Sequence, residues 1–502
     1  MEWARDTLAS LYYVVCALLV LYGSYRIVLL VLAMRALQHR RTTPEPVEWP
    51  AVSVQLPLYN ERFVARRLLE AVANLDYPRD RLQIQILDDS TDCTTRLTRR
   101  GAAVLRRRGF DVQFLHRDSR RGFKAGALAA GLERARGEVL AIFDADFVPP
   151  RDFLRRSVPH LLQPGVGVVQ ARWGHLNREA SWLTRTQSIL LDGHFIIEQT
   201  ARDAAGCFLS FNGTCGVLRR QAVLDAGGWS SDTVTEDLDL SVRMQMRGWR
   251  VSYLHDLVVP GEVPADANSF RAQQRRWTKG GVQVARKLLP RILRSPLPWP
   301  RKVEAFLHLT CYGAYPLLLG LALLRTPVRV FAPTQAFLGF LPGEIELLAL
   351  GTLPLVVFYA VAARHAGHNG SGWRLLGHCL GAMTLGAGLA VSNTRAVLEG
   401  LHGDDHTFER TPKQGWTRPL STRSNSCGAV LPASYRSPGT TIAIAEIAIV
   451  FYLVLWKVFG TGHGMLGDLP FLIFFCSGLL QMALPALRRW LEASATARWA
   501  SS

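Results

Sequence analysis

Hydrophobic and polar positions divide the chain into three regions. Residues 8–34 form one apolar run, and a helix that crosses a bilayer needs about 20 such residues. From 45 to 301 no apolar run is long enough to span a bilayer. Long apolar runs return after 301. The pattern predicts an N-terminal membrane anchor, a soluble domain and a C-terminal membrane region, at 1–44, 45–301 and 302–502.

Short apolar stretches of the soluble region are the strand candidates. They alternate with amphipathic stretches, which predicts an α/β domain around a mostly parallel sheet. Ligands of such sheets bind outside the carboxyl ends of the strands. The candidate strands lie at 51–56, 82–87, 112–115, 139–143 and 166–169.

Arginines set the expected orientation of the chain in the membrane. Arg35, Arg40 and Arg41 follow the first apolar run at once, and basic residues gather on the cytosolic side of membrane helices. A signal peptide is the alternative, but its apolar part would be shorter and a small-residue cleavage site would follow. We therefore expect an anchor that leaves the next residues in the cytosol.

The C-terminal region contains five further apolar runs. Counting all of them as spans gives six with the anchor, which would place the basic stretch 395–436 outside the cell. If 375–400 instead lies on the cytosolic face or re-enters from it, five spans remain and the basic stretches fall inside. We expect five spans, with an interfacial helix and a loop at 393–436. The runs lie at 303–324, 345–363, 375–391, 441–458 and 469–487.

Composition agrees with a membrane protein and adds little about chemistry. Hydrophobic residues make up 49% of the chain and the formal net charge is +18, most of it from arginine. An arginine excess fits anionic lipid headgroups, nucleic acid or nucleotide phosphates without choosing among them. The eight cysteines contain no CxxC pair, so we expect neither a zinc finger nor a disulfide framework.

Two aspartates follow the candidate strand at 139–143. Burying unpaired carboxylates is costly, so a cation should neutralise Asp144 and Asp146. Asp-x-Asp suits Mg²⁺ or Mn²⁺, which take oxygen ligands and keep positions open for diphosphate oxygens. The alternative is that they cap a helix starting near Pro149, but one residue suffices for a cap. We expect Asp144 and Asp146 to bind a divalent metal.

Two further acidic motifs each have a structural alternative. Asp88 and Asp89 follow the strand candidate at 82–87, yet such clusters are also ordinary turns and N-caps. Glu236 and Asp237 precede a helical stretch, where acids suit the helix dipole. The functional interpretation makes Asp237 a general base that takes a proton from an acceptor hydroxyl.

Basic and aromatic residues precede the second membrane region. A basic interfacial belt with Trp is common there. The alternative assigns Arg276 to the charge of a departing diphosphate and Trp277 to the floor under a sugar ring. Lys124 is a similar phosphate or sugar candidate in a chain with few lysines.

The order of these motifs resembles the D, D, D, QxxRW signature of family 2 glycosyltransferases of the cellulose-synthase superfamily. The resemblance is greatest to plant cellulose-synthase-like mannan and glucan-backbone synthases and their bacterial relatives, and covers about residues 50 to 290. Segments 170–173, 191–199 and 211–214 also match that branch. The signature falls on Asp88 and Asp89, Asp144 and Asp146, Asp237, and Gln273 with Arg276 and Trp277.

The resemblance implies a GT-A-like α/β domain in the cytosol, flanked by transmembrane α-helices, with Mg²⁺ or Mn²⁺ on Asp144 and Asp146. Asp237 would be the base, with Glu236 beside it. The donor site would comprise Tyr59, Glu61, Asp88, Asp89, Lys124, Asp144 and Arg276. The acceptor site would comprise Phe211, Asn212, Gly213, Thr214, Gln273 and Trp277.

In such enzymes the acceptor hydroxyl attacks the anomeric carbon directly, so an α-linked donor gives a β-linked product. We expect a processive synthase that uses UDP-glucose or GDP-mannose to build a glucan, mannan or glucomannan and passes it through its own helices. One alternative adds a single sugar to a membrane lipid; another is a non-catalytic transporter or scaffold. We expect membrane lipids and accessory export subunits as partners, no nucleic acid, and a multi-pass location in a bacterial inner membrane.

Phe408, Thr411 and Lys413 resemble the gating loop of cellulose synthases, a Phe-x-Val-Thr-x-Lys segment that closes over bound nucleotide. Arg410 stands where Val is usual, and a basic juxtamembrane loop is the alternative. Since only 488–502 follow the last apolar run, we expect no cyclic-dinucleotide-sensing domain.

Overall fold

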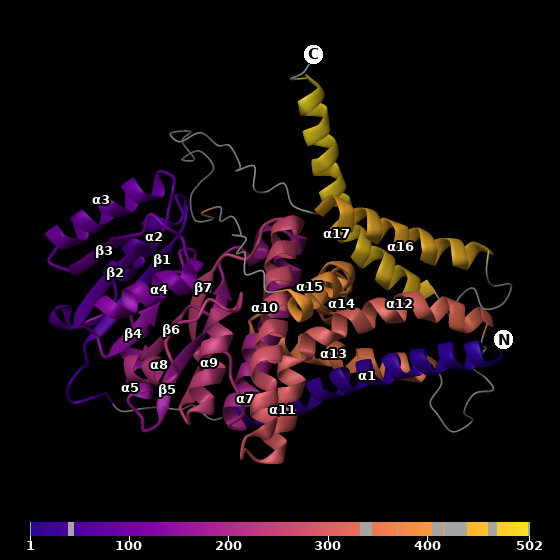
Figure 1. The fold of residues 1–502 in the computed structure, drawn as a ribbon, viewed down its shortest axis with the longest axis horizontal. Coiled ribbons are helices and arrows are strands. Elements are labelled where there is room, and N and C mark those ends of the chain that lie inside the picture. Colours follow the sequence, from indigo (N-terminus) through magenta and orange to yellow (C-terminus); the bar gives the residue numbers. More distant parts are fainter. Residues whose placement is uncertain are drawn as a thin grey trace.

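A sheet-centred domain lies beside a group of long helices (Figure 1). This computed structural model describes residues 2–38, 45–331, 344–368, 370–403, 415, 439–459 and 469–499. Helix α10, Ala267–Arg294, stands between the two parts. It packs on α9 (Glu236–Met246) of the domain and on three helices of the helical group, α11 (Trp299–Leu309), α15 (Ala390–His402) and α17 (Leu469–Trp499).

Seven strands in the described part of the chain form one mixed sheet, in the order β3-β2-β1-β4-β6-β5-β7. β1 to β4 are parallel to one another, β6 runs antiparallel to β4 and β5, and β5 pairs in parallel with β7. The strands are β1 Val52–Leu58, β2 Leu82–Asp88, β3 Asp111–His116, β4 Val139–Ile142, β5 Val166–His175, β6 Gly216–Arg219 and β7 Arg250–Gly261.

Helices cover both faces of the sheet, which explains why its strands β1, β2 and β4 are buried on both faces. Helices α2 (Ala65–Ala73), α3 (Thr94–Arg107) and α5 (Phe153–Leu161) share one buried apolar cluster with the strands. The other face is covered by α4 (Phe123–Arg134), α8 (Arg220–Asp225) and α9 (Glu236–Met246). The domain is therefore a three-layer α/β sandwich.

The predicted fold class is confirmed, and all five strand candidates are strands. The sequence analysis missed β6 and β7. β6 has four residues, too few for a visible apolar pattern. In β7 the polar residues His255 and Asp256 interrupt the apolar alternation. Both strands owe their pairing to neighbours that are distant in sequence.

Three helices of the described chain are long and apolar enough to cross a membrane: α1 (Glu2–Ala36), α16 (Gly439–Phe459) and α17 (Leu469–Trp499). The number rises to five if each of two bent helix pairs is one span. Helix α13, Glu344–His365, contains a shorter apolar stretch and packs along α1.

The two bent pairs are breaks in otherwise apolar segments. Helices α11 (Trp299–Leu309) and α12 (Ala314–Phe331) meet at 47°, and α14 (Gly372–Gly388) and α15 (Ala390–His402) meet at 48°. The second break falls inside the segment for which the sequence offered a re-entrant or interfacial helix. The remaining elements are α6 Trp182–Asp192, α7 Gln199–Ala204, the π-helical turn η3 Gly193–Glu198, and the short 3₁₀ turns η1 Arg79–Arg81, η2 Arg178–Ala180 and η4 Cys311–Gly313.

Candidate functional site

One cavity brings together residues from the sheet, from α4 and α9, and from α10. Nine residues proposed from the sequence line it: Lys124, Asp144, Asp146, Asn212, Glu236, Asp237, Gln273, Arg276 and Trp277. Seven others lie outside its lining: Tyr59, Glu61, Asp88, Asp89, Phe211, Gly213 and Thr214.

Asp144 and Asp146 follow β4 at its carboxyl end. Oδ1 of Asp144 lies 2.6 Å from Nζ of Lys124, and the backbone N–H of Asp144 donates to Oγ1 of Thr214 at 2.8 Å. The Asp146 side chain is almost fully buried. Neither caps the following helix, because α5 has Asp152 at its N-cap position. The capping alternative for this motif is therefore wrong.

Lys124 is the shared countercharge of the cavity. Its Nζ reaches Asp144 and donates to the backbone oxygen of Gly213 at 2.9 Å. Burial by itself would lower the pKa of Lys124, but the negative charges of Asp144, Glu236 and Asp237 outweigh burial and raise it. The lysine is therefore held in its charged form.

Glu236 and Asp237 open α9 at the cavity wall. Burial, and next the charge of Asp237, raise the pKa of Glu236 to about 7. Burial also raises the pKa of Asp237, against the lowering effect of Lys124. Thr235 stands at the N-cap position, yet its side chain makes no capping hydrogen bond. Carboxylates with raised pKa values in a cavity are candidates for proton transfer.

The loop before β6 approaches the Asp237 side chain closely. Gly213 has φ +78°, and a Cβ at this position would lie 2.7 Å from Oδ2 of Asp237 and 3.3 Å from Nζ of Lys124. Both the backbone conformation and the lack of space require glycine here. The close approach of this loop fixes how Asp237 and Lys124 face each other.

Asn212 is the member of this loop that lines the cavity. Its N–H donates to Oε1 of Gln170 at 2.9 Å, and Nε2 of Gln199 donates to its Oδ1 at 2.9 Å. Phe211 and Thr214 are buried beneath it. These two predicted acceptor residues therefore support the loop from below, and their contact with an acceptor stays a prediction.

Aromatic rings form a further part of the cavity wall. Trp277 of α10 faces Trp173, with ring centroids 6.5 Å apart, and Trp173 also packs on Phe147 and Phe195 at 5.0 and 4.9 Å. Trp173 was not among the site residues predicted from the sequence, because the predicted strand ended at 169. Its position at the carboxyl end of β5 is the signal that could have identified it.

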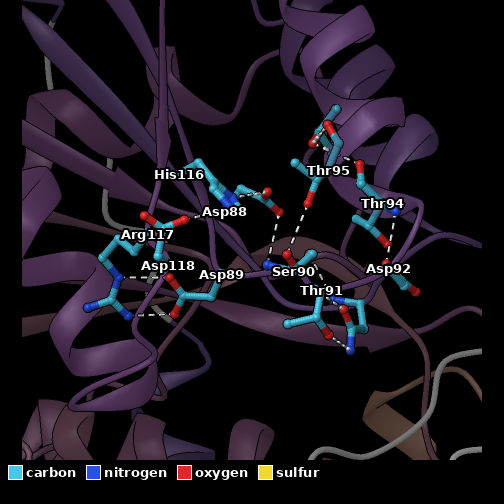
Figure 2. Close-up of polar contacts among 12 residues, drawn as sticks. Asp88, Asp89, Ser90, Thr91, Asp92, Thr94, Thr95, His116, Arg117 and Asp118 are labelled. Atoms are coloured by element: carbon cyan, nitrogen blue, oxygen red, sulfur yellow. Dashed lines mark hydrogen bonds and ion pairs between the residues drawn. The ribbon is translucent and has the colours of Figure 1, made fainter.

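Asp88 and Asp89 have dedicated partners of their own (Figure 2). Oδ2 of Asp88 lies 2.8 Å from Nδ1 of His116, and Arg117 donates to both oxygens of Asp89 at 2.7 and 2.5 Å. The same guanidinium donates to the backbone oxygen of Phe123 at 2.9 Å. This cluster thus braces the residue that precedes the cavity lysine, and its predicted contact with a nucleoside stays a prediction.

The loop after β1 lies next to this cluster. The guanidinium of Arg120 lies 3.5 Å from the ring centroid of Tyr59. The backbone N–H of Asn60 donates to Oγ of Ser90 at 2.8 Å, which ties the loop to the end of β2. Tyr59 therefore lies beside Arg120, and neither Tyr59 nor Glu61 lines the cavity.

Glu262 also lines the cavity, although it was not predicted from the sequence. Nη1 of Arg67 lies 2.8 Å from its Oε1, and Nη2 of Arg67 donates to the backbone oxygen of Asp146 at 2.8 Å. The N–H of Gly415 donates to its other oxygen at 3.3 Å. A residue just after the predicted gating loop thus reaches the cavity edge. Phe408, Thr411 and Lys413 themselves lie outside the described residues.

The carboxylates that could hold a metal are Asp144 and Asp146. No group of three or more His, Cys, Asp or Glu side chains with metal-binding geometry occurs in the described chain. Mg²⁺ and Mn²⁺ are commonly held by one or two carboxylates together with substrate phosphates, so such a group is not required. The hard oxygen donors present fit a divalent ion that binds with its substrate.

Comparison with known proteins agrees with the motifs. Residues 139–363 match the family described as Glycosyl transferase family group 2. Glucomannan 4-beta-mannosyltransferase 2 of Arabidopsis thaliana is 43% identical over 252 residues, which are 49% of this chain and 47% of the relative. Glucomannan 4-beta-mannosyltransferase 9 of the same plant is 37% identical over 333 residues, 62% of each chain. The chain thus spans about half the length of the first of these relatives.

A solved structure supports the fold. A mannosyltransferase of Pyrobaculum calidifontis, determined with GDP-Man and Mn²⁺, aligns with a TM-score of 0.55 and 23% identity, over 78% of this chain and 99% of the other. At this identity the likeness concerns the GT-A-like fold alone. The resemblance inferred from the motifs is confirmed, and the chain carries a family 2 glycosyltransferase domain similar to that of cellulose-synthase-like glucomannan mannosyltransferases.

Proposed function

We propose that the chain is a membrane-bound, inverting, metal-dependent glycosyltransferase that transfers mannose or glucose from a nucleotide sugar to the end of a β-linked glycan. The observation that carries the proposal is the cavity itself. Two metal-type carboxylates, Lys124, and Asp237 with a raised pKa line the same space. An aromatic wall that includes Trp277 closes the same space.

The residues take distinct parts in the proposed reaction. Asp237 accepts the proton of the acceptor hydroxyl while that oxygen bonds to the anomeric carbon and the bond to the diphosphate breaks. Asp144 and Asp146 would hold Mg²⁺ or Mn²⁺, which neutralises the departing nucleoside diphosphate. Because attack is direct, the configuration inverts and no covalent sugar–enzyme intermediate is required.

Sugar rings would be held by the aromatic wall and by α10. Trp277 and Trp173 offer apolar faces against which a pyranose ring packs. Gln273 supplies an amide for acceptor hydroxyls, and Arg276 supplies a guanidinium for the diphosphate. Both lie on the helix that joins the domain to the membrane helices.

GDP-mannose is the first donor to test, because the curated relatives are named as mannosyltransferases. We propose a processive enzyme with its catalytic domain in the cytosol of a bacterial cell, several helices in the inner membrane, and product passage through those helices. The support is the position of α10, which carries the acceptor wall and packs directly on α15 and α17.

The test uses the purified full chain in lipid nanodiscs with labelled GDP-mannose or UDP-glucose, with Mg²⁺, Mn²⁺ or EDTA. Product size and digestion by a β-mannanase or a β-glucanase identify the polymer. A β-linked polymer that forms only with metal is the expected result. A single-sugar, solvent-extractable lipid would favour the transferase to a membrane lipid. No donor turnover under any condition would favour the scaffold and contradict the proposal.

A further inference from the structure

A fully buried carboxylate lies within one of the helices long enough to cross a membrane. Glu446 belongs to α16 and has no exposed surface. Nη2 of Arg271, a residue of α10, lies 2.8 Å from its Oε2. Ionisable residues in membrane helices are costly and usually have a function. Arg271 stands two residues before Gln273, at the beginning of the cavity-lining segment of α10.

The pair is poorly suited to a purely stabilising role. Among the described residues, Oε1 of Glu446 and both Nε and Nη1 of Arg271 are buried without a hydrogen-bond partner. A buried ion pair repays its desolvation only when its remaining polar atoms are satisfied, and apolar side chains of similar size are often equally stable or better. Stability alone therefore does not account for this pair.

Helix geometry relates the pair to the cavity. Successive residues of an α-helix are about 100° apart around the axis, so Arg275 lies near Arg271 on one face of α10. Gln273, Arg276 and Trp277 fall on the opposite face, which lines the cavity. The rotation of α10 about its axis therefore decides whether these three side chains meet the substrate.

Further ion pairs hold α10 to the C-terminal helices. Arg275 donates to both oxygens of Glu399 in α15, at 2.9 and 2.8 Å. Arg489 of α17 lies 2.8 Å from Oδ1 of Asp266, the N-cap residue of α10. Of these contacts, the one between Arg271 and Glu446 is the most deeply buried on both sides.

We propose that Glu446 is a positioning residue for glycosyl transfer: through Arg271 it fixes the rotation of α10, and thereby the placement of Gln273, Arg276 and Trp277. This inference rests on the proposed function. Lys124, Asp144 and Asp146 lie on other elements, so Arg276 is the proposed diphosphate contact that loss of the pair displaces. Nucleotide binding therefore weakens less than transfer to the acceptor.

The first experiment compares Glu446→Gln with wild type in nanodiscs. Misplacement of Gln273, Arg276 and Trp277 lowers kcat for transfer about 10- to 100-fold. GDP affinity, measured with Mn²⁺, falls less than about tenfold, because Arg276 is displaced but the metal carboxylates and Lys124 are untouched. Glu70→Gln, which breaks the exposed pair with Arg66, is the matched control and keeps wild-type transfer.

Two double variants separate positioning from folding. The apolar pair Arg271→Met with Glu446→Met is expected to keep or raise the melting temperature, yet to retain the low kcat. The exchanged pair Arg271→Glu with Glu446→Arg is expected to recover transfer.

Wild-type transfer by the apolar pair would overturn the inference. So would an exchanged pair that melts like wild type but transfers no better than Glu446→Gln. If the wild-type chain transfers no sugar at all, the proposed function itself fails, and that outcome is distinct from both.

Discussion

Two groups of carboxylates lie at strand ends of the same sheet, and they differ in how their charges are balanced. Asp88 and Asp89 each have a partner of their own, His116 and Arg117. At the end of β4, in contrast, Lys124 faces several carboxylates at once. Arg67 also lies at that site, where it donates to the backbone oxygen of Asp146 and pairs with Glu262.

The difference separates carboxylates that have partners of their own from carboxylates that share one cation. A carboxylate with a dedicated guanidinium is held in place by charge-assisted hydrogen bonds. When one lysine serves several buried carboxylates, some remain incompletely compensated and their pKa values rise, as observed for Glu236 and Asp237. A group that titrates near neutral pH can accept a proton during a reaction.

The largest expected effect comes from Asp237→Asn. The amide keeps the shape of the side chain but cannot accept the proton of the acceptor, so kcat for transfer should fall about 10²- to 10⁴-fold. Radiolabel transfer from the donor measures the loss, and GDP affinity reports whether the cavity is still formed. Asp256→Asn, which removes a surface carboxylate paired with Arg156, is the matched control. Wild-type turnover by Asp237→Asn would show that Asp237 is not the base.

A smaller effect, on pH dependence, is expected from Glu236→Gln. Because the charges of the Glu236 and Asp237 carboxylates repel each other, removing the Glu236 charge lowers the pKa of Asp237, and the acid limb of the kcat/KM profile should move to lower pH. Lys124→Met should move it to higher pH, because Lys124 lowers the pKa of both carboxyls. Shifts in the same direction for both variants would contradict a shared countercharge.

The substitution Glu236→Gln should also change how the stability of the protein depends on pH. The folded pKa of Glu236, about 7, exceeds its usual 4.5, so the folded state holds a proton that the unfolded state has lost. Wild-type stability therefore falls as pH rises through this window. The melting temperature of Glu236→Gln should exceed that of wild type by a difference that grows between about pH 4.5 and 7. A difference that does not change with pH would contradict the raised pKa.

The smallest effect on chemistry is expected from Asp89→Asn. Weakening the contact with Arg117 should cost about 1.5–3 kcal/mol of folding free energy, measured by denaturant or thermal unfolding. Transfer by the folded protein should fall less than about tenfold, since the cavity carboxylates stay in place. A loss as large as that of Asp237→Asn, with weaker donor binding, would instead place Asp89 in direct contact with the nucleoside.

Much of the fold could be predicted from the sequence, because local patterns carry it. The five strands with short apolar stretches, the helices between them and the long apolar helices α1, α16 and α17 follow from periodicity and length. β6 and β7 could not be found this way. Their strand conformation depends on pairing with β4 and β5, which local residue preference does not encode.

The candidate site also has features that the sequence predicts and features that depend on the tertiary structure. The sequence by itself determined the resemblance to family 2 glycosyltransferases, through the order of the acidic motifs and of Gln273, Arg276 and Trp277, and the roles of these residues stay predictions. Only the tertiary structure decided which carboxylates face the cavity with raised pKa values, that Trp173 belongs to the wall, and that Arg271 contacts Glu446. The physical reason is that charge balance and burial depend on neighbours from distant parts of the chain, which only folding brings together.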